Sequence, residues 1–225
     1  VQALRYNTTG SNNVAIGLGA LVTNTTASNN TAVGYQALYA EDTESSLVAV
    51  GYQAMYNNNS GIRNTAVGYQ ALESNVSGGS NTACGYEALV NNTADANSAF
   101  GNDALRNNTT GEKNTAVGDE ALENNTTASF NTAVGHHALT TTTNGGENTA
   151  VGQTALELCT SGANCTAVGK GALQNVTTGS TNTGLGRLAG NDITTGTNNL
   201  CVGGEAGRSN SPSGAINTGS NNIVL

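Results

Sequence analysis

Two cysteines in this chain are spaced so that they could form a covalent cross-link. Cys159 and Cys165 bracket a short polar segment, residues 160–164, that has the composition of a turn. A disulfide between them would pin this turn and would imply an oxidising, extracellular setting. Two free thiols are the alternative, and the sequence favours neither state.

The other two cysteines stand where related segments of the chain carry Val or Ala. We therefore expect Cys84 and Cys201 to be buried as small apolar side chains. They are separated by seven segments, which is roughly 30 Å at the spacing of β-strands and far beyond the reach of a disulfide.

His136 and His137 are the residues best suited to bind a metal ion. Because they are adjacent, they should point to opposite sides of a strand. In a threefold assembly one of them could form a ring of three imidazoles. No second ligand stands at a suitable spacing, so the sequence predicts no metal site and no cofactor.

Catalytic chemistry is not indicated anywhere in the chain. Serines, histidines and acidic residues occur, but none recurs as a nucleophile beside a base and an orienting group. We therefore expect no catalytic residue and no enzymatic activity.

Four tyrosines recur at one constant interval along the chain and should stack into a ladder: Tyr35, Tyr52, Tyr69 and Tyr86. Packing between neighbouring segments, or between chains, is the favoured interpretation. The alternative is an exposed aromatic strip that binds glycans. Later segments carry polar or charged residues at this place, which indicates that it faces solvent at least in part.

These residues are positioned by a repeat that runs through the chain. A glycine returns at an interval of seventeen from Gly17 to Gly203, with a single interval of sixteen between Gly85 and Gly101. Counting that glycine as repeat position 1, position 4 is Ala and position 5 is mostly Leu. Positions 14 to 17 are typically Asn-Thr-Ala-Val, as in residues 64–67. Such a constant period indicates stacked structural units.

The repeat predicts an all-β fold, a parallel β-solenoid or β-roll of about twelve 17-residue coils. Seventeen residues are too few for the helix pairs of most α-repeats, and a glycine in every apolar segment disfavours helix. The Thr-Ala-Val segment suits a short strand, followed by turn residues. We expect the Val of position 17 and the Leu of position 5 to form the core. The Asn column at position 14 should hydrogen-bond from one coil to the next.

The small number of large apolar residues predicts self-association. Each coil would bury about two large aliphatic side chains, which falls short of the entropy lost by seventeen ordered residues. A single chain should therefore be marginal and unable to close a core of its own. Small residues at positions 16, 1 and 4 would allow close approach of neighbouring chains, so we expect a parallel homotrimer, intertwined or side by side.

Composition and charge exclude several partners. The net charge is −8 and the seven basic residues are scattered, so nucleic acid is not an expected partner. No apolar run approaches the length of a membrane span, so no membrane insertion is expected.

The chain should consist of a repetitive shaft, residues 1–207, and a terminal segment, residues 208–225. The terminal segment contains an insertion with the only proline, Pro212, which predicts a loop. Residues 220–225 then look like the start of a further coil. We expect the chain to be a segment of a longer fibre.

The Asn-Asn-Val-Ala-Ile-Gly of residues 12–17 and the Asn-Thr-Ala-Val-Gly-Tyr-Gln-Ala-Leu of residues 64–72 carry a resemblance to two related groups. One is the head repeats of trimeric autotransporter adhesins. The other, which the 17-residue period favours, is the repeat region of bacteriophage tail fibres that precedes an endosialidase-type intramolecular chaperone. The resemblance implies a trimeric fibre on a virion or a cell surface. It gives this segment no hydrolase activity.

The leading functional hypothesis is therefore a structural shaft that holds a receptor-binding tip, outside this segment, against a host glycan or protein. Glycan binding by the tyrosine ladder itself is the alternative. Ice binding is a further alternative, but the threonines near positions 9 and 10 are too irregular for a flat Thr-x-Thr face.

Overall fold

The computed structural model describes residues 2–40, 44–210, 214 and 216–225. The chain divides into two compact units, Val1–Lys113 and Asn114–Leu225. The division falls inside the stretch 1–207 that the sequence predicts to be one shaft. The predicted boundary after residue 207 stays a prediction.

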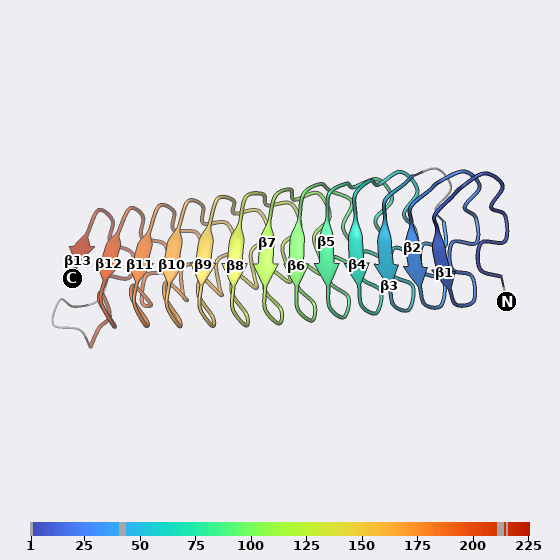
Figure 1. The fold of residues 1–225 in the computed structure, drawn as a ribbon. Coiled ribbons are helices and arrows are strands. Elements are labelled where there is room, and N and C mark those ends of the chain that lie inside the picture. The colour runs from blue at the N-terminus through green and yellow to red at the C-terminus, as the bar shows by residue number, and fades with distance from the viewer. Residues whose placement is uncertain (1, 41–43, 211–213, 215) are drawn as a thin grey trace. The chain divides into compact units, whose positions relative to one another are not determined.

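The first unit is a parallel β-solenoid in which each strand lies beside the next and a loop returns the chain to the same side (Figure 1). The shortened interval leaves the register intact, because Ala83 still pairs with Ala99. Its strands are β1 (Val14–Ile16), β2 (Thr31–Val33), β3 (Val48–Val50), β4 (Thr65–Val67), β5 (Thr82–Cys84) and β6 (Ser98–Phe100).

The second unit repeats this architecture, and all its neighbouring strands also pair in parallel. Its strands are β7 (Thr115–Val117), β8 (Thr132–Val134), β9 (Thr149–Val151), β10 (Thr166–Val168), β11 (Thr183–Leu185), β12 (Leu200–Val202) and β13 (Ile223–Val224).

The predicted all-β parallel β-solenoid is confirmed. The solenoid has about eleven turns, close to the predicted number of coils, and the described residues contain no helix. Among those residues, accordingly, no helix is long and apolar enough to cross a membrane.

Each turn is filled by small and medium side chains of the same chain. The middle residue of most strands and the residues at positions 4 and 5 are buried, as Ala66, Ala71 and Leu72 illustrate with no exposed surface. These columns pack tightly, since a Cβ atom at Gly184 would lie 2.8 Å from Cγ of Leu173. The expectation that one chain cannot close an interior of its own is therefore wrong.

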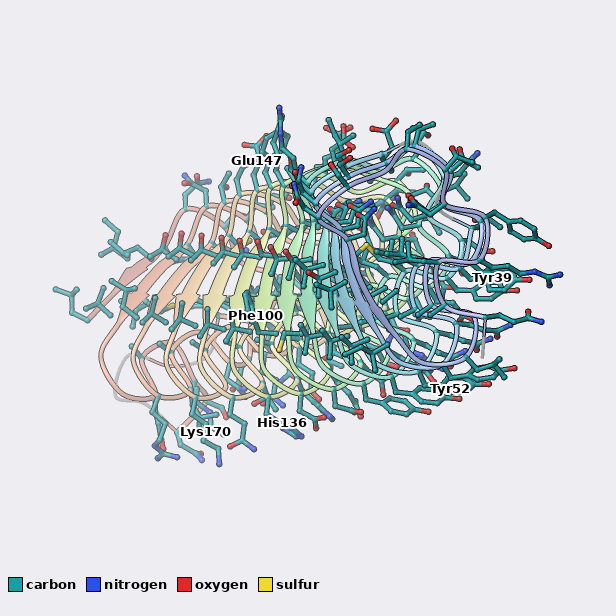
Figure 2. The ribbon with its side chains drawn as sticks, turned by 45° about the vertical axis from the view of Figure 1, so that its right-hand side comes forward. Tyr39, Tyr52, Phe100, His136, Glu147 and Lys170 are labelled. Atoms are coloured by element: carbon teal, nitrogen blue, oxygen red, sulfur yellow. The ribbon has the colours of Figure 1, made fainter. Side chains whose placement is uncertain are left out.

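The third residue of each strand lies outside, although the sequence analysis placed it in the core. Val67 is 37% exposed and Phe100 is 43% exposed. Figure 2 shows Phe100 among the side chains that stand on the outside of the sheet. Side chains alternate along a strand, so an Ala that points inward forces both of its neighbours outward. Cys84 is exposed for the same reason, and its predicted burial is wrong.

The buried asparagines connect successive turns, as predicted. The backbone N–H of Asn131 donates to Oδ1 of Asn114 at 2.9 Å, and the backbone N–H of Asn148 donates to Oδ1 of Asn131 at 2.9 Å. Nδ2 of Asn131 donates to the carbonyl of Gly145 at 3.0 Å. Most of these bonds therefore join an amide side chain to backbone, which satisfies polar groups that no water can reach.

Tight corners in each turn are made by residues with positive φ at positions 3, 5 and 13. In one turn these are His137 (φ 56), Leu139 (φ 54) and Glu147 (φ 60). Gly19 and Gly171 occupy position 3 in other turns, also at positive φ. A residue with a Cβ atom is strained in this region, and a β-branched residue most of all.

Thr154 has φ 56 at position 3, so Thr154→Gly should stabilise the chain. Removing the strain of a left-handed backbone should raise the free energy of unfolding by about 1–2 kcal/mol. The greater conformational freedom of glycine in the unfolded chain should lower it by about 0.4–1 kcal/mol. Urea denaturation should show a net gain of roughly 0.5–1 kcal/mol. The control is Thr149→Gly in strand β9, which should destabilise the chain. Equal losses in both variants would contradict the prediction.

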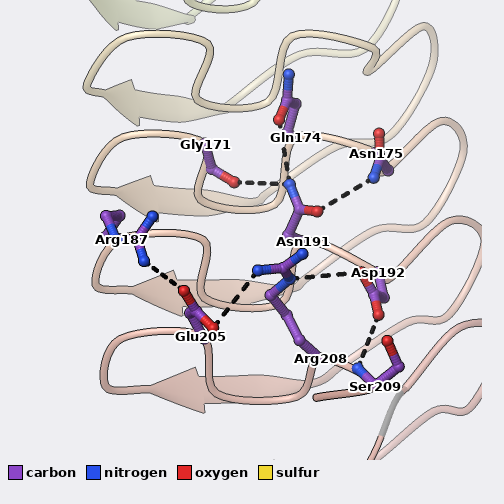
Figure 3. Close-up of polar contacts among 9 residues, drawn as sticks. All are labelled: Gly171, Gln174, Asn175, Arg187, Asn191, Asp192, Glu205, Arg208 and Ser209. Atoms are coloured by element: carbon purple, nitrogen blue, oxygen red, sulfur yellow. Dashed lines mark hydrogen bonds and ion pairs between the residues drawn. The ribbon is translucent and has the colours of Figure 1, made fainter. Parts of the chain in front are cut away.

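Arg208 and Ser209, which follow residue 207, bond to residues earlier in the chain (Figure 3). Arg208 pairs with Asp192 (Nε–Oδ1 3.7 Å) and with Glu205 (Nη1–Oε2 3.6 Å), and the backbone N–H of Ser209 donates to Oδ2 of Asp192 at 2.8 Å. Pro212 lies outside the described residues.

The chain end re-enters the sheet after this segment. Strand β13 pairs with β12 so that Ile223 lies beside Leu200. The sequence predicts that residues 220–225 begin a further coil; within them, Ile223 and Val224 pair with β12, and the coil itself stays a prediction.

Candidate functional site

The outer side of the sheet carries mostly aliphatic and threonine side chains, which are exposed or half-buried in the described residues. We call the side chains at positions 15 and 17 the sheet face. No residue of the strands in the described part of the chain is charged. In the first unit the exposed members are Val14, Ile16, Val48, Val67 and Phe100, and in the second they are Val117, Val151, Val168, Leu185 and Ile223. A contiguous apolar surface of this kind is typical of an interaction site.

Threonines alternate with these aliphatic residues on the sheet face. In the second unit position 15 is Thr in five successive strands, β7 to β11. Neighbouring strands of the sheet are about 4.8 Å apart. The sheet face is therefore a regular array of methyl and hydroxyl groups.

The tyrosine ladder (Tyr35, Tyr52, Tyr69 and Tyr86) forms as predicted. Successive ring centroids are 5.2, 5.1 and 5.0 Å apart and the rings are nearly parallel. Each tyrosine is 42–48% exposed. A hydrogen bond with Glu87 raises the pKa of the Tyr86 hydroxyl.

Stacking determines which part of each ring can meet a ligand. Tyr52 and Tyr69 each have a ring on both faces, so they present mainly edges and hydroxyl groups to solvent. A sugar ring that stacks on an aromatic residue needs a free aromatic face. The ladder geometry therefore favours packing over a continuous glycan strip.

A second tyrosine pair was not identified from the sequence. Tyr39 and Tyr56 stack at 5.0 Å, and Figure 2 shows Tyr39 and Tyr52 projecting away from the ribbon. The sequence does indicate this pair, because Tyr39 and Tyr56 are separated by one period of the repeat.

Removing an inner ring should cost more than removing an end ring. Tyr69→Ala loses two stacked pairs, and we expect it to lower the free energy of unfolding by about 1–3 kcal/mol at 0.5–1.5 kcal/mol per pair. Tyr86→Ala loses one pair and should cost about half as much. Chemical denaturation measures both variants, and equal effects would show that ring stacking contributes little.

The Cys159–Cys165 pair replaces a pair of asparagines. These cysteines occupy positions 8 and 14, where another turn holds Asn58 and Asn64 with an amide–amide hydrogen bond of 3.3 Å. Both thiols are buried and free in the structure. Burial, with the neighbouring Cys165, raises the pKa of Cys159 to about 12. The disulfide is not formed here and stays a prediction, while Cys201 is buried as expected.

His136 and His137 lie side by side rather than on opposite sides, which corrects the sequence expectation. They follow strand β8 in a turn, and the positive φ of His137 brings the two rings into a stack with centroids 3.9 Å apart. Asp119 and Glu120 occupy the same two positions one turn earlier. The sequence gives no sign of this group if positions 2 and 3 belong to a strand, because adjacent residues on a strand point to opposite sides.

The comparisons with known proteins add no relative. No family model, no curated protein and no solved structure matches this chain.

Proposed function

We propose that this chain is a shaft segment of a trimeric fibre, a phage tail fibre or a surface adhesin, on a virion or a cell surface. Its task would be to hold a tip, located outside this segment, against a host receptor. The observation that carries the proposal is the sheet face, where exposed aliphatic residues alternate with threonines and the described strand residues carry no charge in either unit.

The geometry supports a side-by-side arrangement of chains. Each chain fills its own interior, so association is not needed to complete a core. It would instead cover the aliphatic residues that the sheet leaves in water, at about 25 cal/mol for each Å² of apolar surface removed. Three equivalent copies joined in this way would form a closed assembly, which limits uncontrolled aggregation.

Rung-to-rung bonding supports a mechanical role. Within each unit the strands and the returning loops both bond to the next turn, for example the N–H of Leu72 to the carbonyl of Ala88 at 3.1 Å. Side-chain hydrogen bonds also join neighbouring turns, for example from Nδ2 of Asn75 to Oδ1 of Asn58 at 3.0 Å. Such a structure suits a rigid spacer.

Charged residues placed on the sheet face test the proposal. Val117→Glu with Val151→Glu should convert the trimer to single chains, because three copies would bring buried carboxylates together. Sedimentation velocity measures the mass, and circular dichroism checks that the solenoid remains. The matched control is Asn144→Glu with Ser161→Glu, two exposed turn residues, which should leave the mass unchanged. A sheet-face variant that keeps the wild-type mass would refute the proposed interface.

Glycan binding by the tyrosine ladder is the alternative role. It would use the ring edges and hydroxyl groups that remain exposed. On a glycan array, Tyr52→Ala with Tyr69→Ala should then abolish binding without a change in oligomer mass. Binding that survives this double substitution removes the ladder as the glycan site.

Ice binding gains support from one observation, the threonine column in β7 to β11. The threonines near positions 9 and 10 are irregular, whereas those at position 15 are regular and lie on the sheet. An ice-recrystallisation assay on the purified chain tests this role. Absence of inhibition would eliminate it.

A further inference from the structure

The two histidines of the chain and two acidic residues meet on one edge of the second unit. His136 and His137 follow strand β8, and Asp119 and Glu120 follow strand β7 at the same repeat positions. In Figure 2, His136 projects from the ribbon on the side opposite to Glu147. All four side chains are half-buried or exposed, so they can be reached from solvent.

Distances within this cluster are short. Nε2 of His136 lies 3.4 Å from Oδ2 of Asp119, and Nε2 of His137 lies 2.8 Å from Oε2 of Glu120. Nδ1 of His137 lies 3.6 Å from Oε1 of Glu157. One ligand atom each from Asp119, His136 and His137 lie within 4.8 Å of one another.

We propose that Asp119, His136 and His137 form a binding site for one borderline divalent transition-metal ion, such as Zn²⁺. The site is independent of the fibre role proposed above.

The set of ligands determines the kind of ion. Two imidazole nitrogens and a carboxylate oxygen suit Zn²⁺, Cu²⁺ or Ni²⁺, whereas Mg²⁺ and Ca²⁺ prefer sites made of oxygen alone. With bonds of about 2.0–2.2 Å in a tetrahedron, ligand atoms should lie roughly 3.4 Å apart. Exposed side chains can make this adjustment by rotation about their χ angles. Water would complete the coordination.

Two neighbouring carboxylates, Glu120 and Glu157, are placed to hydrogen-bond a metal-binding histidine. A histidine that binds a metal usually holds a carboxylate or a carbonyl at its other ring nitrogen, which fixes the orientation of the ring. His137 has one such group near each nitrogen, Glu120 and Glu157. Whichever nitrogen of His137 binds the ion, a carboxylate is in reach of the other.

The backbone brings these residues together before any ion binds. His137 has φ 56, and its backbone N–H donates to the carbonyl of Asp119, one solenoid turn earlier, at 3.0 Å. An ion bound here would bridge two turns of the solenoid. Binding should therefore raise the melting temperature of the chain.

The repeat supplies a matched variant that should fold. The next turn carries Gln153 and Thr154 at the positions of His136 and His137, so His136→Gln with His137→Thr copies residues that the fold already accommodates. Glu147→Gln, an exposed carboxylate on another side of the second unit, is the control. All proteins carry Cys84→Ser, which removes the exposed thiol.

Isothermal titration of the full chain with Zn²⁺ should show one site per chain. We expect the double histidine variant and Asp119→Asn each to weaken binding at least about tenfold, and Glu147→Gln to leave it unchanged. Mg²⁺ or Ca²⁺ in equal amount should not displace Zn²⁺, and the melting temperature should rise with Zn²⁺ only when both histidines are present. Unchanged Zn²⁺ affinity in the double variant, or displacement by Ca²⁺, would overturn the proposal.

Discussion

Replacing Gly68 by alanine should destabilise the first unit by about 4 kcal/mol or more, among the largest effects of a single substitution. Gly68 has φ 145, and a Cβ atom there would lie 2.1 Å from the carbonyl oxygen of Gly85 and 2.7 Å from its carbonyl carbon. These are backbone atoms of the next turn, which is held in place because the N–H of Gly85 donates to the carbonyl of Val67 at 2.9 Å. Neither turn can move aside without breaking the ladder.

Urea denaturation followed by circular dichroism measures this loss. The control is Gly204→Ala, because Gly204 is exposed and a Cβ atom there would meet nothing within 4 Å. That variant should stay within about 0.5 kcal/mol of the wild type. A Gly68→Ala protein with wild-type stability would show that the glycine column does not lie at the turn-to-turn contact.

Replacing Asn131 by alanine should be the second large effect, with a loss of about 2–4 kcal/mol. Its side chain serves two turns at once, as acceptor for the N–H of Asn148 and as donor to the carbonyl of Gly145. Alanine leaves both groups buried without these partners, and an unsatisfied buried polar group costs about 1–3 kcal/mol. The void left by the amide adds to this loss.

The matched control for this prediction is Asn144→Ala in an exposed turn of the same unit. It should change the free energy of unfolding by less than about 0.5 kcal/mol. If both substitutions lower the free energy of unfolding equally, the buried asparagines would not stabilise the contact between solenoid turns.

The strand order and register could be predicted from the sequence because one residue type marks them without ambiguity. Glycine recurs where each turn approaches the next most closely, as at Gly68. The period of this column gives the number of residues in a turn, and residues one period apart pair in the sheet.

The sequence was less informative about which strand residues are buried, because hydrophobicity alone predicts burial of the wrong residue. Val67 is larger and more apolar than Ala66, yet Ala66 is the buried residue. The interior is narrow because Leu72 and the asparagines already fill it, so a small side chain is required on the strand. That Ala occurs at position 4 in every coil was the available signal of a tight interior.

The acid–histidine group could not be predicted, since it depends on backbone torsion rather than on residue type. Adjacent residues diverge on a strand but can converge where φ is positive, as at His137. Gly171 at the same repeat position hinted at such a backbone. The tyrosine ladder, by contrast, follows directly from the repeat, because equal spacing along a parallel solenoid places rings above one another.

The measurement that most directly tests this account is the mass of the unmodified chain in solution, by light scattering. If the apolar sheet face joins three copies, the particle should weigh three times the 22.5 kDa of a single chain and keep that mass on dilution. A folded particle of 22.5 kDa at every concentration would mean that the sheet face stays in water, and it would contradict the fibre shaft.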